Sequence, residues 1–552
     1  MKMTGAELIT RLLERQGINK IIGIPGSSNL PLYSALAESA ISYVLARHEQ
    51  GAGFIAQGIA RSTGRPAVCF TTSGPGATNA ITAIADAKLD SVPIIVITGQ
   101  VATGMMGTDA FQEVDTYGLT IPITKHNFLV RTPDELLKII PEAFTLAMSG
   151  RPGPVVIDIP RDVQTSMVEF DMYPAPGEKN NGMHPDMDRL ERIAQKINSS
   201  RKPILYIGGG IISSDTCAGL YALSKRNSIP VTSSLMGLGA FPSDNPLFSG
   251  MLGMHGARYT NYILDEADLL VALGVRFDDR ATGKAMEFAP NASVIHIDID
   301  QAEIDKIRET DLNLIGDLRH SIKELVHLVE ENRREDWMGY IASMKKEFPY
   351  PEPQSDSLFH PVNLLRAIHS RADKKSIVTT DVGQHQMWTA QYYPFNHPRT
   401  LLTSGGLGTM GFGLPTAIGA AIANPDRRII CISGDGSFLM NIQELATLKD
   451  LEPDLTVFIM NNNSLGLVRQ QQELFFGKKY VSSLFGSNPD FAGIAEKFGI
   501  RGINLELEND PMRAIERSLG ETGPCVVNVP VSLDDNVFPM VPPGSANREM
   551  IG

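Results

Sequence analysis

Short apolar runs alternate with longer stretches of helical periodicity along the whole chain. The runs are rich in β-branched residues, and each leads into or out of a helix-like stretch. In chain order they lie at 21–25, 66–76, 92–100, 153–160, 204–210, 229–235, 267–277, 292–300, 376–383, 428–437, 454–463 and 525–532. Continuous apolar strands separated by helices are typical of parallel sheets that are covered on both faces. The pattern therefore predicts an α/β fold with three doubly wound parallel sheets.

Two breaks rich in proline and polar residues divide the chain. Residues 173–188 (YPAPGEKNNGMHPDMD) and 349–357 (PYPEPQSDS) have no hydrophobic periodicity, which is typical of linkers between domains. A chain of 552 residues is also too long for a single hydrophobic core. We therefore expect three domains, at 1–172, 189–348 and 358–552, each within the usual size range.

Composition and charge exclude several classes of protein. Hydrophobic residues make up 43% and charged residues 20% of the chain, as in soluble globular proteins. No apolar run reaches the roughly 18 residues that would span a bilayer, and the amphipathic start lacks a secretory core, so we expect a cytoplasmic protein. A net charge of −13 argues against nucleic acid or an acidic membrane surface as a partner. The four cysteines lack zinc or redox spacings, which predicts buried thiols at Cys69, Cys217, Cys431 and Cys525.

The third segment carries the strongest chemical motif. A predicted strand at 428–433 leads into a glycine-flanked turn at Asp435, and a helix and a second strand then lead to Asn462, 27 residues after Asp435. Such a unit places two strand ends side by side, so the carboxylate and the amide oxygen can share a hard cation such as Mg²⁺ that also holds a diphosphate. The dipole at the N-terminus of the helix that begins near Ser437 would stabilise the negative charge of the phosphates. The alternative is an ordinary turn and an ordinary loop.

The spacing of GDGS and NN resembles the motif of the thiamine-diphosphate-dependent enzymes. The resemblance implies that Asp435, Asn462 and the backbone carbonyl of Ser464 hold Mg²⁺. In the loop GGLGTMGFGLP, Met410 stands where such enzymes use a large apolar side chain to fold the cofactor into a V shape, although plain core packing is an alternative. The remaining residues that the resemblance assigns to thiamine diphosphate are Val382, Gly383, Gln384, His385, Gly408, Gly434, Gly436, Ser437, Leu465 and Gly466.

This cofactor also needs one carboxylate that activates its aminopyrimidine ring, and Glu49 is the candidate. It lies in RHEQGAGF, where a strand ends and a helix of small residues begins, so the carboxylate can meet a ligand in a partly dry setting. A solvated glutamate at a helix start is the alternative, but the whole block matches the family. Because Glu49 and Asp435 stand in different predicted domains, the cofactor must bridge two of them. Family members do so across a dimer interface, which implies a homodimer or homotetramer.

Among these enzymes the chain resembles the acetolactate (acetohydroxyacid) synthases over essentially its whole length. The resemblance implies that Phe111 and Gln112 face the reacting keto acid, and that Arg276 pairs with the carboxylate of the second substrate. Met254 and Val382 would line an apolar pocket, and each could instead belong to the core. The blocks that carry the resemblance include GTDAFQEVD, SGRPGPVVIDIPRDVQ, MLGMHG, LGVRFDDRATGK and DVGQHQMW.

The middle segment resembles the FAD-binding domain of these synthases. Its glycine run at 208–210 lacks the GxGxxG pattern, so the run alone would fit any dinucleotide or a tight turn. FAD would have a structural role, because the carboligation transfers no net electrons. The residues that the resemblance assigns to FAD are Arg151, Gly208, Gly209, Gly210, Ser234, Leu235, Met236, Gly274, Arg276, Asp298 and Asp317.

Three residues in the implied substrate region depart from the family pattern. Ser27 replaces the second glycine of the usual IPGG turn, and Arg161 replaces a lysine, keeping the charge but not the shape. Anabolic synthases have a tryptophan that favours 2-ketobutyrate at the position of Gln471. A polar glutamine at this position resembles the catabolic enzymes. We therefore expect a weaker preference for 2-ketobutyrate and poor inhibition by sulfonylurea-type compounds.

The resemblance implies acetolactate synthase activity on 2-keto acids, as the first step of branched-chain amino acid biosynthesis, with a possible small regulatory subunit as partner. A flavin-using pyruvate oxidase, another thiamine-diphosphate decarboxylase or carboligase, and a non-catalytic cofactor-binding subunit are the alternatives. The tail at 537–552 is expected either to close over the site as a lid or to fray.

Overall fold

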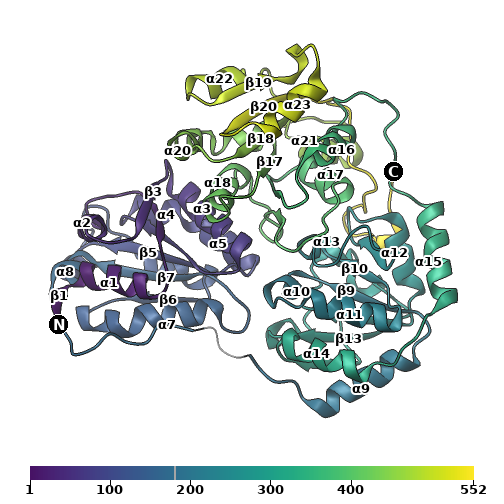
Figure 1. Ribbon diagram of the computed structural model, residues 1–552, viewed down its shortest axis with the longest axis horizontal. Helices are drawn as coiled ribbons and strands as arrows, with labels where there is room; N and C mark the ends of the chain where they lie inside the picture. Colours follow the sequence, from purple (N-terminus) through teal and green to yellow (C-terminus); the bar gives the residue numbers. More distant parts are fainter. Residues whose placement is uncertain (179–181) are drawn as a thin grey trace.

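The computed structural model describes residues 1–178 and 182–552 and contains three six-stranded parallel sheets (Figure 1). We call each sheet with its helices a unit, named first, middle and third in chain order. The predicted class, with three parallel sheets in an α/β fold, is confirmed, whereas the exact domain limits stay a prediction. The predicted linker at 173–188 includes residues 179–181, which lie outside the described residues.

The first unit has the strand order β3-β2-β4-β5-β7-β6. Its strands are β2 (Lys20–Gly23), β3 (Ser42–Leu45), β4 (Ala67–Thr71), β5 (Ile94–Gln100), β6 (His126–Leu129) and β7 (Val155–Pro160). Its helices are α1 (Gly5–Arg15), α2 (Leu30–Ala37), α3 (Glu49–Thr63), α4 (Pro75–Asn79), α5 (Ile81–Leu89), α6 (Thr116–Thr120), α7 (Leu136–Met148) and α8 (Arg161–Thr165). The chain start forms β1 (Lys2–Thr4), which pairs antiparallel with β8 (Met167–Glu169). Thr4 then caps α1 by a capping box with Glu7.

The middle unit has the order β11-β10-β9-β12-β13-β14. The chain starts at the central strand β9 and adds β10 and β11 on one side, and then adds β12, β13 and β14 on the other side. This order is that of the dinucleotide-binding sheets. Its strands are β9 (Pro203–Ile207), β10 (Val231–Ser233), β11 (Phe248–Met251), β12 (Leu269–Leu273), β13 (Ser293–Asp298) and β14 (Leu312–Ile315). Its helices are α9 (Met187–Ser199), α10 (Gly209–Ser213), α11 (Cys217–Asn227), α12 (Arg258–Glu266), α13 (Asp279–Thr282), α14 (Leu318–Leu328) and α15 (Glu335–Glu347).

The third unit has the order β16-β15-β17-β18-β20-β19, so its strands are connected in the same sequence as those of the first unit. Its strands are β15 (Ile377–Thr380), β16 (Leu401–Leu402), β17 (Ile429–Gly434), β18 (Leu455–Asn461), β19 (Arg501–Asn504) and β20 (Cys525–Pro530). Its helices are α16 (Pro361–Arg371), α17 (Gln384–Tyr392), α18 (Gly413–Ala423), α19 (Asp435–Leu439), α20 (Leu445–Leu451), α21 (Gly466–Phe475), α22 (Phe491–Lys497) and α23 (Pro511–Gly520).

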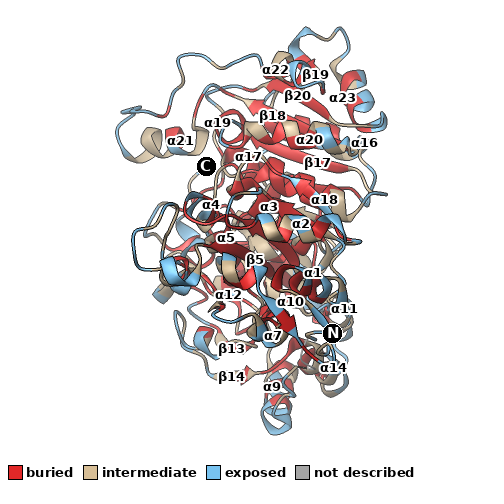
Figure 2. Ribbon diagram, turned by 90° about the vertical axis from the view of Figure 1, so that its left-hand side faces the viewer, coloured by how far each residue is buried: buried red, intermediate tan, exposed pale blue. Residues whose placement is uncertain are grey.

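The inner strands of each sheet are buried, and the exposed residues lie on outer helix faces, edge strands and loops (Figure 2). The first and third units also share one hydrophobic cluster, because α3 packs directly on α18. Glycines allow this close approach. A Cβ atom on Gly419 would lie 1.9 Å from the carbonyl oxygen of Ile55, so no larger residue fits without moving the helices apart. The two units are therefore joined by a continuous core.

The prediction that all four cysteines are buried is wrong, and one of the two alternatives for the tail is excluded. Cys217, at the start of α11, is partly exposed, and only the other three cysteines are buried. The tail does not fray, because Val537, Met540 and Val541 are buried and Met540 packs against Met254 of the middle unit. Across residues 1–178 and 182–552, the structure contains no helix long and apolar enough to cross a membrane.

Candidate functional site

In each of the three sheets, the strand order reverses between two neighbouring inner strands. The loops that leave these two strands border a crevice. These strands are β2 and β4 in the first unit, β9 and β12 in the middle unit, and β15 and β17 in the third. Ligands of doubly wound sheets bind in such crevices, beyond the carboxyl ends of the strands. Two cavities lie at the crevices of the middle and third units.

The smaller cavity, of about 150 Å³, belongs to the third unit. It is lined by every residue that the sequence assigned to thiamine diphosphate except Glu49: Val382, Gly383, Gln384, His385, Gly408, Met410, Gly434, Asp435, Gly436, Ser437, Asn462, Ser464, Leu465 and Gly466. The structure therefore brings together residues from four separate segments, at 382–385, 408–410, 434–437 and 462–466. Trp388 of α17 also lines this cavity.

Asp435 and Asn462 come to the cavity because β17 and β18 are parallel neighbours that end together, with Gly434 paired to Met460. The carboxylate of Asp435 accepts hydrogen bonds from the Gly436 N–H (2.9 Å) and the Asn488 amide (2.6 Å). Burial raises its pKa, although these donors act in the opposite direction. A buried carboxylate beside amide and carbonyl oxygens is a donor set that suits Mg²⁺.

The shape of the smaller cavity fits the phosphate end of a cofactor. Helices α17, α19 and α21 begin at Gln384, Asp435 and Gly466, and all three residues line the cavity. Helix N-termini offer free N–H groups to phosphate. A Cβ atom on Gly434 would lie 2.8 Å from the ring of His385, so glycine is needed for the backbone to come close. Burial lowers the pKa of His385 to about 3, which leaves its imidazole neutral.

The loop that carries Met410 is fixed by a buried aspartate that the sequence analysis did not single out. Asp381 follows β15, and its carboxylate accepts the N–H groups of Val382 (2.9 Å), Gly411 (2.8 Å) and Gly413 (3.0 Å). These bonds tie the loop after β15 to the start of α18. Burial raises the pKa of Asp381 to about 6 against the effect of these donors.

The larger cavity, of about 900 Å³, opens between the three units and has the size of a cofactor site. It is lined by all the residues assigned to FAD, namely Arg151, Gly208, Gly209, Gly210, Ser234, Leu235, Met236, Gly274, Arg276, Asp298 and Asp317. Met254 and Gln471, assigned to substrate, line it as well. Val382, Gly408 and Leu467 line both cavities, which are therefore adjacent.

The glycine run of the middle unit has a steric reason. Gly208 and Gly210 leave β9 directly against Gly274, which leaves β12 with a φ of 61°. A Cβ atom on Gly208 or Gly210 would lie 2.4 Å or 2.6 Å from Gly274. The two loops at the switch point therefore approach as bare backbone, which leaves room for a dinucleotide. These features fit FAD.

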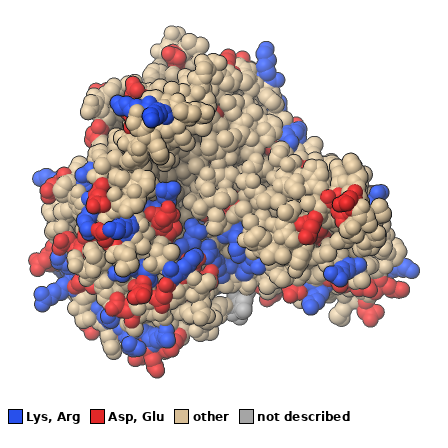
Figure 3. Space-filling model, turned by 180° about the vertical axis from the view of Figure 1, so that it is seen from behind, with Lys and Arg blue, Asp and Glu red and all other residues tan. Residues whose placement is uncertain are grey.

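Basic side chains at the larger cavity also link the units. Arg151 of the first unit contacts Glu303 (2.6 Å) and Asp300 (3.2 Å) of the middle unit. Arg276 of the middle unit donates to the carbonyl of Leu89 at the end of α5, at 2.6 Å. On the face seen in Figure 3, Lys and Arg side chains gather near the centre. Guanidinium groups at such a cavity suit phosphate and carboxylate ligands.

Glu49 is buried at the first residue of α3, as predicted, but it is not among the described residues that line either cavity. Its carboxylate accepts a hydrogen bond from the Asn79 amide at 2.9 Å. The preceding N–H groups of Arg47 and His48 both donate to Glu444 of the third unit at 3.0 Å. Glu444 therefore fixes the segment that presents Glu49, although no motif in the sequence marks it.

The other residues assigned to substrate lie on the first unit, away from both cavities. Phe111 is 86% exposed, and Ser27 and Arg161 are exposed. Gln112 adopts a φ of 60°, and its backbone packs over Gly74. These residues and Glu49 follow β2, β3, β5 and β7, so they share the carboxyl edge of the first sheet. Within one chain, this edge is not joined to the smaller cavity.

Comparison with protein families gives matches in all three units. The N-terminal TPP binding domain of thiamine pyrophosphate enzymes matches residues 3–119, their central domain matches residues 190–325, and their C-terminal TPP binding domain matches residues 381–529.

Individual relatives match over the whole chain. The chain is 52% identical to the acetolactate synthase isozyme 1 large subunit of Escherichia coli (strain K12), with 100% of the chain and 98% of the relative covered. It is 44% identical to the isozyme 2 large subunit of the same organism (100% and 99%) and to the acetolactate synthase large subunit of Cyanidium caldarium (100% and 97%). The chain therefore belongs to the thiamine pyrophosphate enzymes, in the family of the acetolactate synthase large subunits.

Proposed function

We propose that the chain is the catalytic subunit of an acetolactate synthase, which removes carbon dioxide from pyruvate and joins the remaining two-carbon unit to a second 2-keto acid. A second pyruvate gives 2-acetolactate, and 2-ketobutyrate gives 2-aceto-2-hydroxybutyrate. The observation that carries this proposal is the gathering of the thiamine-diphosphate motif around one cavity, in a chain similar to acetolactate synthase large subunits over its full length.

The smaller cavity would hold the diphosphate of thiamine diphosphate, with Asp435, Asn462 and the Ser464 carbonyl around Mg²⁺. A volume of about 150 Å³ takes only part of that cofactor, so the rest would lie outside the smaller cavity. When bound, thiamine diphosphate supplies the electron sink for decarboxylation. FAD would occupy the larger cavity, against the glycine turn of the middle unit.

The side chains of the protein would bind and orient the substrates. Glu49 would hydrogen-bond a ring nitrogen of the cofactor, and Arg276 would pair with the carboxylate of the second keto acid. The apolar side chains of Phe111 and Met254 exclude water from the reacting carbons. The polar Gln471 at the larger cavity supports acceptance of pyruvate as the second substrate.

The active site would be completed by a second copy of the chain. Glu49 and the exposed Phe111 lie on the carboxyl edge of the first sheet, apart from the smaller cavity of the same chain. A partner copy that presents this edge to the cavity would unite them, so we propose at least a homodimer. The large-subunit names of the relatives support a further proposal, that a small regulatory subunit binds.

Product analysis tests the proposal. Purified protein with thiamine diphosphate, Mg²⁺, FAD and equal amounts of pyruvate and 2-ketobutyrate should form acetohydroxyacids, with 2-acetolactate in excess. Oxygen uptake or release of acetaldehyde as the main result would instead indicate an oxidase or a decarboxylase.

The substitution Glu49→Gln tests the activating carboxylate. It should lower turnover by about a hundredfold or more, because an amide cannot share the proton, and should leave the thermal unfolding midpoint nearly unchanged. Glu38→Gln changes an exposed glutamate at the end of α2 and serves as the control, with normal turnover expected. Near-normal turnover of Glu49→Gln would contradict the assignment.

A further inference from the structure

One loop of the third unit forms a wall of both cavities. Residues 404–408 line the larger cavity, and Gly408 and Met410 line the smaller one. The loop contains few side chains that could anchor it, because its sequence is Ser-Gly-Gly-Leu-Gly-Thr from Ser404 to Thr409. Its position must therefore be set by contacts that other parts of the molecule make with its backbone and hydroxyl groups.

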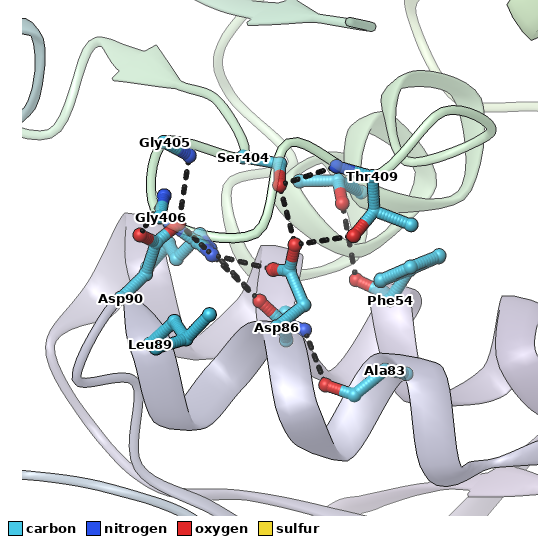
Figure 4. A network of polar contacts seen from close by, with 12 residues as sticks. Phe54, Ala83, Asp86, Leu89, Asp90, Ser404, Gly405, Gly406 and Thr409 are labelled. Carbon is cyan, nitrogen blue, oxygen red and sulfur yellow. Dashed lines mark hydrogen bonds and ion pairs between the residues drawn. The ribbon is translucent and has the colours of Figure 1, made fainter. Parts of the chain in front are cut away.

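Two carboxylates of the first unit make four of those contacts (Figure 4), and Gln386 of α17 adds one to the Ser404 carbonyl at 3.0 Å. Asp86 of α5 accepts hydrogen bonds from the hydroxyls of Ser404 and of Thr409, the latter at 2.9 Å. Asp90, directly after α5, accepts the N–H groups of Gly405 at 3.0 Å and Gly406 at 2.7 Å. Both ends and the middle of the loop are thus held from another unit.

These carboxylates are buried and share one cation. The side chains of Asp86 and Asp90 are 0% exposed, and Arg61 of α3 contacts them at 3.0 Å and 2.9 Å. Arg61 also donates to the carbonyl of Thr403, just before the loop. One guanidinium cannot fully compensate two buried carboxylates. Asp86 and Asp90 therefore also depend on the hydrogen-bond donors of the loop, because hydrogen bonds to buried charges are strong and costly to lose. Burial accordingly raises the pKa of Asp86.

The end of α5 is also the place where the three units meet. The carbonyl of Leu89 accepts a hydrogen bond from Arg276 of the middle unit, beside the contacts of Asp90 with the third unit. A shift of α5 would therefore move the loop and the wall of the larger cavity together. The hydrogen bond between Asp90 and Gly405 is a tertiary contact, since it links residues that are 315 positions apart in the chain.

We propose that Asp86 and Asp90 are positioning residues for cofactor binding, which hold the 404–409 loop in the conformation that both cavities require. Neither carboxylate lies among the residues assigned to a cofactor. The inference rests on the proposed function, because it takes the two cavities as the sites of thiamine diphosphate and FAD. Its consequence is that loss of a loop contact weakens the binding of both cofactors together.

The test measures binding directly. Thr409→Val removes one hydroxyl donor to Asp86 and keeps the side-chain shape, and Asp86→Asn removes the charge. The matched control is Thr416→Val, because the Thr416 hydroxyl donates across the same interface to the Phe54 carbonyl at 3.4 Å but lies on α18, outside the loop. Equilibrium dialysis of each full-length apo-protein gives the dissociation constants for FAD and for thiamine diphosphate with Mg²⁺. Fluorescence of Trp388, in a Trp337→Phe background, reports locally on the smaller cavity.

We expect Thr409→Val and Asp86→Asn to raise both dissociation constants by about tenfold, the usual effect of losing one hydrogen bond to a charge. Thr416→Val should stay within about twofold of the parent, since a purely structural loss at this interface lowers stability without moving the loop. Unchanged dissociation constants for Thr409→Val would overturn the proposal, even if Asp86→Asn fails to fold. A parent that binds both cofactors but forms no acetolactate would overturn only the proposed function.

Discussion

Buried carboxylates recur as the side chains that fix functional loops, and Asp158 shows how burial alters such a group. It lies on β7 and accepts hydrogen bonds from the Thr98 hydroxyl (2.6 Å) and the Gln100 amide (2.9 Å). Gln100 also donates to the carbonyl of Val114, so the network holds the loop that carries Phe111. Burial raises the pKa of Asp158 to about 7, although its hydrogen bonds act in the opposite direction.

This raised pKa predicts a pH-dependent stability. Between about pH 4 and pH 7 the unfolded chain has lost the proton of Asp158 while the folded chain keeps it, so the free energy of unfolding falls as pH rises. Asp158→Asn removes this dependence and can keep both hydrogen bonds. The urea midpoint of the variant relative to the wild type should therefore increase steadily from pH 5 to pH 7.

The control for this prediction is Asp426→Asn, which changes an exposed aspartate. Its midpoint relative to the wild type should not vary across the same pH range. A constant difference between Asp158→Asn and the wild type would show that Asp158 is ionised throughout the range, and would contradict the prediction.

Among the helices, α3 and α18 make the closest contact between units, which predicts a strong effect of a single methyl group. Gly58 and Gly419 face each other, and a Cβ atom on Gly58 would lie 2.1 Å from the Thr416 carbonyl oxygen. Gly419→Ala should lower the free energy of unfolding by about 3 kcal/mol, because packed backbones cannot move apart without opening the core. Gly339→Ala in α15 is the control, since nothing lies within 4 Å of its Cβ position.

Chemical denaturation measures both variants. The exposed Gly339→Ala should stabilise the protein by about 0.5 kcal/mol, because alanine is the better helix former. Gly419→Ala should lower activity as well, since the same contact holds α3 and therefore Glu49. Equal stability of the two variants would mean that the contact between α3 and α18 is loose.

The sequence predicted the inner strands and missed most of the edge strands, for a physical reason. The twelve apolar runs correspond to the four inner strands of each sheet. Inner strands are covered on both faces and read as continuous apolar runs. Edge strands such as β6 (HNFL) and β19 (RGIN) are partly exposed and carry polar residues, so no apolar run marks them. The order of the strands depends on pairing between distant segments and could not be predicted.

The residues of the candidate site also divide into those that the sequence predicted and those that it did not. Residues of the cofactor motif lie on loops directly after inner strands, so their place could be predicted from the strands. Asp86, Asp381 and Glu444 could not, because they act through hydrogen bonds to loops distant in sequence. A signal existed only for Asp86, a single carboxylate in the apolar helix ITAIADAKL, where an unpaired charge would be costly.

At the scale of the whole molecule, the separation of Glu49 from the smaller cavity predicts that activity needs two chains. In the proposed homodimer each chain would supply Glu49 to one site and Asp435 to the other, so a chain with Glu49→Gln and a chain with Asp435→Asn should each be inactive as homodimers. In a heterodimer of the two, one site carries both substitutions and the other carries neither.

Co-expression with two different affinity tags, followed by purification on both, isolates that heterodimer. It should recover about half of the wild-type activity, because one of its two sites is intact. The control is a second heterodimer, in which one chain carries both substitutions and the other chain carries none. Each of its sites has one altered residue, so it should be inactive if chains share sites, and about half active if each site lies within one chain. The two heterodimers contain the same residues in total, so a difference between them can arise only from how the chains divide the site.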